Sequence, residues 1–196
     1  ALPPVQAEGK SGLAELLAKR RSVREYRQEP LSLQEVGLLL WAAQGITHAG
    51  GKRTAPSAGA LFPLDLLLVA SRVDGLAPGV YAYRIHEQQL TPRLPGDCSG
   101  TLAAAALEQY AVAHAAATIV ILGNYERTAR KYGERAERYV AMEAGHVAQN
   151  ILLQATELDL GAVPVGAFDD ARVKQVLGTH SAPLYLIPVG RKIDVP

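Results

Sequence analysis

The pattern of apolar and polar positions along this chain predicts both helices and strands. The longest helical pattern covers about 136–158, where apolar side chains recur every three or four residues. That stripe consists of Val140, Ala144, Val147, Ala148, Ile151, Leu152, Ala155 and Leu158. Because glycine often stands just past the end of a helix, we expect Gly161 to terminate this one.

Four shorter helices are predicted. The first contains Leu13 and ends in a basic turn, and the second opens at Ser32, which forms a capping box with Glu35. An alanine-rich helix is expected over 99–113 and a small one over Asp170–Leu177. These patterns leave most of the remaining chain to strands and loops.

Apolar runs predict five strands, at Leu64–Ala70, 80–85, 89–94, 117–122 and 184–189. The second and third are expected to form a hairpin. The stretch 45–63 is rich in Gly, Ala, Ser and Pro and has no helical or strand period, which is typical of a functional or mobile loop. Helices and strands do not alternate regularly, so the fold class predicted is α+β.

Length and composition narrow the class of protein. The 196 residues predict one domain over 11–196, preceded by a polar, proline-bearing arm over 1–10. A net charge of +1 argues against nucleic-acid binding, and no apolar run is long enough to cross a membrane. The single cysteine excludes an internal disulfide and a cysteine-rich metal site. We expect a cytoplasmic protein; because the chain begins at Ala1, an exported form with a removed leader is the alternative.

The segment 20–24 concentrates positive charge. Arg20, Arg21 and Arg24 surround the hydroxyl of Ser22, and arginine is suited to a phosphate dianion because it donates in a planar, bidentate geometry. If the segment is helical, the three guanidinium groups lie close together. The alternative is a solvated basic helix end that complements the helix dipole.

Two loops contain small residues that allow a ligand to approach the backbone. In 55–60, Pro56 sets a turn and Ser57 offers a hydroxyl next to Ala58 and Gly59. In 161–168, Gly166 and Ala167 could leave N–H groups exposed beside a ligand. Ordinary connecting loops are the alternative for both. Neither a phosphate-binding P-loop nor a dinucleotide-binding G-x-G-x-x-G motif is present.

Two further groups of residues are of types that bind metals or act as nucleophiles. Glu143 and His146 share a helical face with Asn150, but a di-iron site needs a second such motif, so no metal is predicted. A buried hydrogen-bonded pair or a ligand-facing polar cluster is favoured instead. The run 97–99 contains Cys98, and a cysteine protease with His48 or His86 as base is an alternative. The predicted helices disfavour that all-β fold, and Ser99 is expected to cap the following helix.

Seven segments together resemble the nitroreductase-like flavoprotein family over nearly the whole chain. They are RRSVREY (20–26), LLLWAAQGIT (38–47), RTAPSAGALFPL (53–64), PGVYAY (78–83), RYVAMEAGHVAQNILLQA (138–155), GAFDD (166–170) and PLYLIPVGR (183–191). The chain looks most similar to the SagB-type dehydrogenase branch, which includes thiazoline/oxazoline oxidases. The resemblance implies a central, mainly antiparallel sheet flanked by helices, in an intertwined homodimer with FMN at the subunit interface.

The resemblance also implies a set of cofactor-binding residues. The phosphate and ribityl chain would be held from 20–24 and from the C-terminal end, and the flavin ring from the two loops and the long helix. The residues are Arg20, Arg21, Ser22, Arg24, Pro56, Ser57, Ala58, Gly59, Gln149, Asn150, Val165, Gly166, Ala167 and Arg191. Pro56 to Gly59 would come from the partner subunit, and the N–H groups of Gly166 and Ala167 would approach flavin N5.

The implied activity is ping-pong hydride transfer through the flavin. The donor is either NAD(P)H, as in a nitroreductase, or a peptide azoline ring, as in the SagB-like oxidases. Gly166-Ala167 replaces the Glu-Gly of many nitroreductases, which weakens the case for nitroaromatic substrates. Candidate catalytic residues are Lys131 and Tyr132, the only match to the Lys–Tyr pair of azoline oxidases, and His146. A flavin- or small-ligand-binding module without turnover is the alternative.

Overall fold

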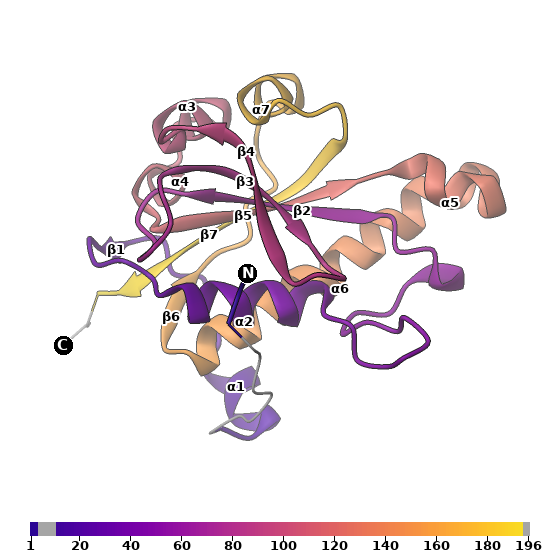
Figure 1. Ribbon diagram of the computed structural model, residues 1–196, viewed down its shortest axis with the longest axis horizontal. Coiled ribbons are helices and arrows are strands. Elements are labelled where there is room, and N and C mark those ends of the chain that lie inside the picture. The colour runs from indigo at the N-terminus through magenta and orange to yellow at the C-terminus, as the bar shows by residue number, and fades with distance from the viewer. Residues whose placement is uncertain (4–10, 194–196) are drawn as a thin grey trace.

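A computed structural model describes residues 1–3 and 11–193, and one seven-stranded sheet runs through this part of the chain (Figure 1). All of its strand pairs are antiparallel. Along the sheet the strands are β1 (Tyr26–Arg27), β7 (Ala182–Lys192), β5 (Ala117–Gly123), β2 (Leu64–Ala70), β3 (Gly79–Arg84) and β4 (Gln89–Pro95), and β6 (Leu160–Ala162) also pairs with β7.

Helices cover both faces of the sheet. The helices are α1 (Leu13–Lys19), α2 (Leu33–Gln44), α3 (Ser99–Ala105), α4 (Tyr110–His114), α5 (Tyr125–Tyr132), α6 (Ala136–Glu157) and α7 (Asp170–Leu177), with 3-10 turns η1 (Ala58–Ala60) and η2 (Gly133–Arg135). One buried cluster joins α2 and α6 to the sheet, and the other joins α3, α4 and α7 to its opposite face. The predicted α+β class, with a mainly antiparallel sheet flanked by helices, is confirmed.

The central strands are apolar on both sides because both faces are covered. In β2, Leu66 and Leu68 belong to the α2–α6 cluster, whereas Leu67 and Val69 belong to the α3–α4–α7 cluster. This alternation follows from the two-residue period of a strand. The predicted strands at 64–70, 80–85, 89–94, 117–122 and 184–189 all lie within or largely within the observed ones.

The helix predictions are mostly confirmed. The capping box at α2 has both of its hydrogen bonds, Glu35 N–H to Ser32 Oγ at 3.2 Å and Ser32 N–H to Glu35 Oε2 at 2.8 Å. The α6 stripe is buried against the sheet, except for Leu158, which is partly buried past the end of the helix. None of the described helices is long and apolar enough to cross a membrane.

Three local predictions are wrong. The helix expected over 99–113 is two helices, because Leu107 and Glu108 both have positive φ (57° and 58°) and break it. Gly161 does not end α6, which stops at Glu157; it lies in β6, where a side chain would meet Val23 Cγ1 at 2.6 Å. Ser99 makes no capping bond, and instead its N–H donates to Asp97 Oδ1 at 2.9 Å.

Most of the predicted arm over 1–10 lies outside the described residues. Of the three that are described, Leu2 is buried and donates its N–H to Gln88 O at 3.0 Å. The start of the chain is thereby attached to the turn between β3 and β4.

Candidate functional site

The basic segment 20–24 is extended rather than helical, because α1 ends at Lys19. Ser22 pairs with Ala162 of β6, and the N–H of Val23 donates to Ala162 O at 3.0 Å. Tyr26 packs so closely on β7 that a side chain at Gly190 would meet Tyr26 Cγ at 2.7 Å. Two glycines, at 161 and 190, therefore allow this segment to lie flat on the edge of the sheet.

Two of the three arginines in this segment carry uncompensated charge. Among the described residues, the side chains of Arg20 and Arg24 make no hydrogen bond or ion pair, and Ser22 beside them is exposed. Arg21 instead donates from Nη1 to the carbonyls of Ala18 and Arg20, both at 2.8 Å, and so serves the end of α1. Arg20, Ser22 and Arg24 are thus a donor set that fits a phosphate.

The loop after β6 presents backbone donors. Val165 is fixed by two hydrogen bonds with Leu186, at 2.8 and 3.0 Å, while Gly166 and Ala167 are exposed. Their N–H groups have no acceptor within the part of the chain that the structure describes. Ala167 O accepts from Gln109 Nε2 at 2.8 Å, which holds this peptide in place. The result is a fixed segment with two N–H groups open to a ligand.

The turn 57–62 has an unusual backbone. Gly59, Ala60 and Phe62 all have positive φ, at 62°, 54° and 46°. Two of these three residues are not glycine, and such strained conformations concentrate at functional sites. The N–H of Phe62 donates to Ser57 Oγ at 2.9 Å, which closes the turn.

The predicted Lys–Tyr pair lies directly against this turn. A methyl group on Gly59 would be 2.8 Å from Tyr132 Oη and 3.0 Å from Lys131 Nζ. The structure therefore brings Lys131 and Tyr132 of α5 to the loop that contains Pro56 to Gly59. Because Gly59 has no side chain, both polar atoms can approach the backbone there.

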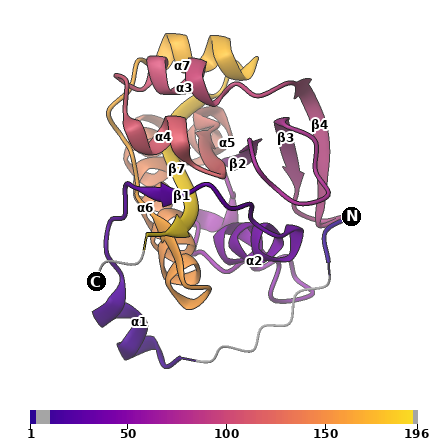
Figure 2. The same cartoon turned by 90° about the vertical axis from the view of Figure 1, so that its left-hand side faces the viewer.

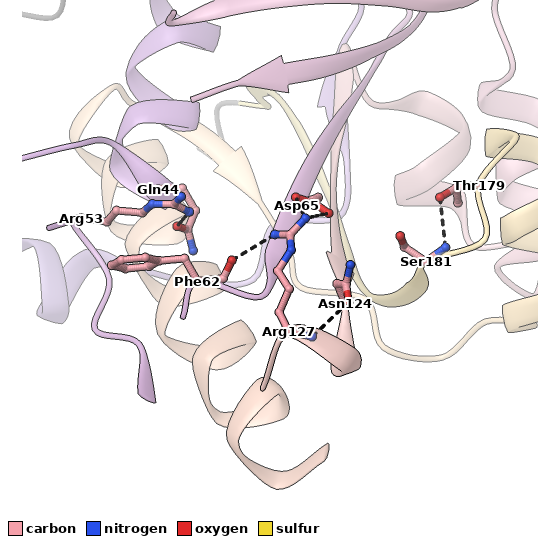
Figure 3. A network of polar contacts seen from close by, with 8 residues as sticks. All are labelled: Gln44, Arg53, Phe62, Asp65, Asn124, Arg127, Thr179 and Ser181. Atoms are coloured by element: carbon pink, nitrogen blue, oxygen red, sulfur yellow. Dashed lines mark hydrogen bonds and ion pairs between the residues drawn. The ribbon is translucent and has the colours of Figure 1, made fainter. Parts of the chain in front are cut away.

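Figure 3 shows how α5 is fixed relative to this turn. Arg127 Nη2 donates to both carboxylate oxygens of Asp65, at 2.9 and 3.0 Å, and Arg127 Nη1 donates to Phe62 O at 3.1 Å. The side chain of Asn124 caps the start of α5 by accepting from the N–H of Arg127 at 3.3 Å. One arginine thus connects the helix, strand β2 and the strained turn.

A buried polar cluster lies behind the same turn. Gln44 Oε1 accepts from Arg53 Nη1 at 2.7 Å, and the Arg53 guanidinium stacks over the Phe62 ring at 4.2 Å (Figure 3). Glu143 of α6 is only 3% exposed. Burial raises the pKa of Glu143, while neighbouring Ser57, Gln44 and Arg53 favour its charged form. Among the described residues, Glu143 Oε1 and Gln44 Nε2 have no hydrogen-bond partner.

The other predicted residues of α6 are distributed around the helix. Asn150 Nδ2 donates to Thr54 O at 3.3 Å, just before the turn, and Gln149 beside it is half-buried. Asn150 also lines a cavity of about 350 Å³ between α1, α2 and α6. Glu143 is buried but His146 is exposed, and no group of three metal-ligating side chains occurs within residues 1–3 and 11–193.

Arg191 has a protein partner. Its Nη1 donates to Glu35 Oε1 at 2.6 Å and its Nη2 to Glu35 Oε2 at 2.9 Å. To reach a phosphate, as the resemblance implies, the guanidinium would have to exchange this carboxylate for the ligand. Cys98 is half-buried, and burial raises the pKa of its thiol, as does Asp97. A protonated thiol argues against the cysteine-protease alternative.

The two groups of site residues lie at opposite ends of the molecule. In Figure 1 the segment leading into β1 is at one end of the long axis. Helix α5, together with the turn η1 that lies against it, is at the other end. Figure 2, turned by 90°, likewise has β1 in front and α5 behind. A single chain therefore does not bring the basic segment and the 57–62 turn to one ligand.

Sequence reasoning missed four residues that organise these regions. They are Gln44, Phe62, Gln109 and Arg127. Each acts on a residue distant in sequence or through a strained backbone, so no local spacing indicates it. For Arg53 a signal exists, because its charge stands directly before a loop of small residues.

Comparison with known proteins gives consistent matches. Residues 17–191 match the sequence profile of the Nitroreductase family. A protein of Methanocaldococcus jannaschii named as a nitroreductase is 47% identical over 182 residues, which cover 93% of this chain and 92% of that protein. The trifolitoxin operon protein TfxC of Rhizobium leguminosarum bv. trifolii is 27% identical over 191 residues, which cover 89% of this chain and 54% of TfxC.

Solved structures share the fold. A protein of Ralstonia eutropha named as a nitroreductase has a TM-score of 0.84 at 26% identity, covering 99% of this chain and 89% of its own. A chain of the E. coli microcin synthetase McbBCD, with truncated pro-MccB17 bound, scores 0.78 at 22% identity, with coverage of 98% and 77%. An Exiguobacterium sibiricum protein in complex with FMN scores 0.67 at 18% identity, with coverage of 97% and 94%. The last two likenesses concern the fold alone.

Proposed function

Because the chain belongs to the nitroreductase family, we propose that it is an FMN-dependent oxidoreductase that works by ping-pong hydride transfer. One observation carries this proposal. Among the described residues, the guanidinium groups of Arg20 and Arg24 have no hydrogen-bond or ion-pair partner, and both stand beside the Ser22 hydroxyl in the sequence. The same segment pairs with β6, which leads to the open N–H groups of Gly166 and Ala167. Phosphate donors and ring donors thus follow one another along one edge.

These residues fit FMN. Arg20, Ser22 and Arg24 would bind the phosphate, and the fixed N–H groups at 166–167 would donate to the ring at N5. Gly166 is not required by packing within the described chain, since a methyl group there would find only Tyr185 Cε1, at 3.8 Å. Close approach of a ligand to the backbone explains a glycine at this position. When bound, FMN supplies the atom that takes up and gives back hydride.

We further propose a homodimer in which a second copy completes each site. The 57–62 turn lies at the far end of the molecule from the segment that leads into β1, which includes residues 20–24. Pro56, Ser57, Ala58 and Gly59 of one protomer would therefore contact the flavin held by the basic segment of its partner. Lys131 and Tyr132 would arrive with that turn, because both lie on Gly59.

The proposed donor is a peptide azoline, with NAD(P)H as the alternative. In support of this donor, the relative TfxC is named for a trifolitoxin operon, and a chain of the McbBCD microcin synthetase complex, with truncated pro-MccB17 bound, shares the fold. In this version Lys131 Nζ and Tyr132 Oη would hold or accept the proton that leaves one carbon of the azoline ring, while the adjacent ring carbon gives up hydride to the flavin and a carbon–carbon double bond forms between them. His146 is the second choice, because it is exposed on α6, whereas Lys131 and Tyr132 lie against Gly59.

Purification with added FMN and a visible spectrum tests the cofactor. We expect a stable flavin band, and Arg24→Ala should weaken FMN binding about 10–100-fold, since a hydrogen bond to a charged group contributes about 1.5–3 kcal/mol. Arg93→Ala is the matched control, because Arg93 lies on β4 and donates to Gly178 O on an exposed face. A protein that stays colourless, or an Arg24→Ala variant with unchanged affinity, would contradict the proposal.

An anaerobic reduction by NADPH and an aerobic assay with a peptide azoline together distinguish the donors. Bleaching of the flavin band by NADPH supports reductase chemistry, whereas oxygen uptake with a peptide azoline and no bleaching by NADPH supports the oxidase. Stable FMN binding with neither activity supports the remaining alternative, a flavin-binding module without turnover.

A further inference from the structure

The strained 57–62 turn needs something to hold it. Gly59, Ala60 and Phe62 occupy the left-handed region, which is unfavourable for the two residues that are not glycine. The only bonds within the turn are Ala60 N–H to Ser57 O at 3.0 Å, Leu61 N–H to Ala58 O at 3.3 Å and Phe62 N–H to Ser57 Oγ at 2.9 Å, among the described residues. Ser57 is therefore the residue on which the turn closes.

The free hydrogen-bond donors in the cluster around Ser57 share one buried acceptor. Arg53 donates to Gln44 Oε1, so the Nε2 of Gln44 is left as a donor. Ser57 Oγ already accepts from Phe62, so its own proton is left to donate. Glu143, buried beside both residues, has an oxygen without a partner in the described part of the chain. An unmatched donor and an unmatched acceptor in one buried cluster complement each other.

We propose that Glu143 is a positioning residue that accepts from Ser57 and Gln44 and so holds the 57–62 turn in the conformation that contacts the flavin. The cluster then forms a ring: Glu143 binds Ser57, Ser57 binds the Phe62 N–H, the Phe62 ring stacks on Arg53, and Arg53 reaches Glu143 through Gln44. Glu143 does not touch the reacting atoms. The flavin part of this inference rests on the proposed function, but the position of the turn does not.

A second contact from the same helix supports this role. Asn150, seven residues after Glu143 and so on the same face of α6, donates to Thr54 O at 3.3 Å. The helix therefore holds the chain just before the turn as well as at the turn. Buried polar groups with directional partners specify one backbone conformation where apolar packing alone does not.

The polarity of the ring gives a sharp test. In Glu143→Gln, an amide replaces the carboxylate at nearly the same volume, and its NH₂ group must face either Gln44 or Ser57, both of which also donate. One bond is therefore lost. The double variant Gln44→Glu with Glu143→Gln restores the ring. Arg53 then donates to the carboxylate introduced at position 44, which also accepts from the amide introduced at position 143, and Ser57 donates to the oxygen of that amide.

Amide hydrogen exchange of the FMN-free protein reads the turn directly. We expect the Phe62 N–H to exchange at least about tenfold faster in Glu143→Gln, and to return to within about threefold of wild type in the double variant, because its partner Ser57 is released and then held again. FMN affinity should fall and recover in parallel. Glu137→Gln, the same change at an exposed position of α6, should alter neither.

Unchanged Phe62 exchange in Glu143→Gln, or a folded double variant without recovery, would overturn the inference. If Glu143→Gln fails to fold, the double variant decides: a folded, FMN-binding protein supports the ring, and an unfolded one refutes it. If wild type binds no FMN, the proposed function fails, while the exchange measurement still tests whether Glu143 holds the turn.

Discussion

The ion pair between Arg191 and Glu35 should couple the last strand to α2 measurably. The two guanidinium–carboxylate bonds are 2.6 and 2.9 Å long, and the side chains are only 25% and 17% exposed. The stabilisation expected from such a half-buried pair is intermediate. An exposed ion pair contributes about 0–1 kcal/mol, and breaking a buried one costs about 3–5 kcal/mol. We therefore expect a coupling free energy of about 1–2 kcal/mol.

A double-mutant cycle with Arg191→Ala and Glu35→Gln, followed by urea unfolding without FMN, measures this coupling. FMN must be absent, because a ligand that binds only the folded state would add its own stabilisation. Arg191→Ala alone should cost about 2 kcal/mol, since Glu35 keeps the bonds from Ser32 at 2.8 and 2.9 Å but loses its charged partner.

The coupling should depend on pH in a defined direction. Burial acts to raise the pKa of Glu35, but hydrogen bonds from Arg191 and Ser32 outweigh it, and the pKa lies below its usual value of 4.5. The folded state therefore binds the proton less well than the unfolded state, so this stabilisation is complete above about pH 4.5 and is lost as the pH falls through the lowered pKa. A coupling below about 0.5 kcal/mol at pH 7, within ordinary additivity scatter, would refute this reasoning.

Two further substitutions test the packing by the same unfolding measurement. The Ile151 side chain is fully buried on α6, so Ile151→Ala should cost about 2–4 kcal/mol. Met142 on the same helix is 48% exposed, and Met142→Ala should change the stability by no more than about 0.5 kcal/mol. Equal costs would contradict the assigned helix face. Gly190→Ala should cost about 1–3 kcal/mol, because its methyl group would meet Tyr26 Cγ at 2.7 Å. The methyl group of Gly145→Ala would face open space, so that substitution should stabilise the protein by about 0.5–1 kcal/mol. Stabilisation at both positions would refute close packing on β7.

Much of the fold could be predicted because its signals are local. The α6 stripe, the Ser32–Glu35 capping box and the apolar strands each depend on residues within a few positions of one another. Predictions failed where a distant contact or a strained backbone decided. Alanine-rich composition gave no sign of the positive φ at Leu107 and Glu108, and the role of Gly161 depends on Val23, which lies far earlier in the chain.

The candidate site divides in the same way. The sequence indicated the basic segment and the two small-residue loops, and the family resemblance implied a ligand for Arg21 and Arg191 as well. The structure directs Arg21 to the end of α1 and Arg191 to Glu35. Guanidinium groups look alike in a sequence, and only their neighbours in space decide which of them remains without a partner.

By itself, the sequence determined the fold class, the helix α6 with its buried face, and the residue types suited to a phosphate and a flat ring. These features depend on side-chain periodicity and local hydrogen bonding, which involve residues that are close together in the chain. Only the tertiary structure decided that Lys131 and Tyr132 meet Gly59, that Glu143 is buried behind the same turn, and that this turn and the segment leading into β1 lie at opposite ends. Those relations depend on how α5, α6 and β7 pack on the sheet, and packing joins residues that no spacing in the sequence connects.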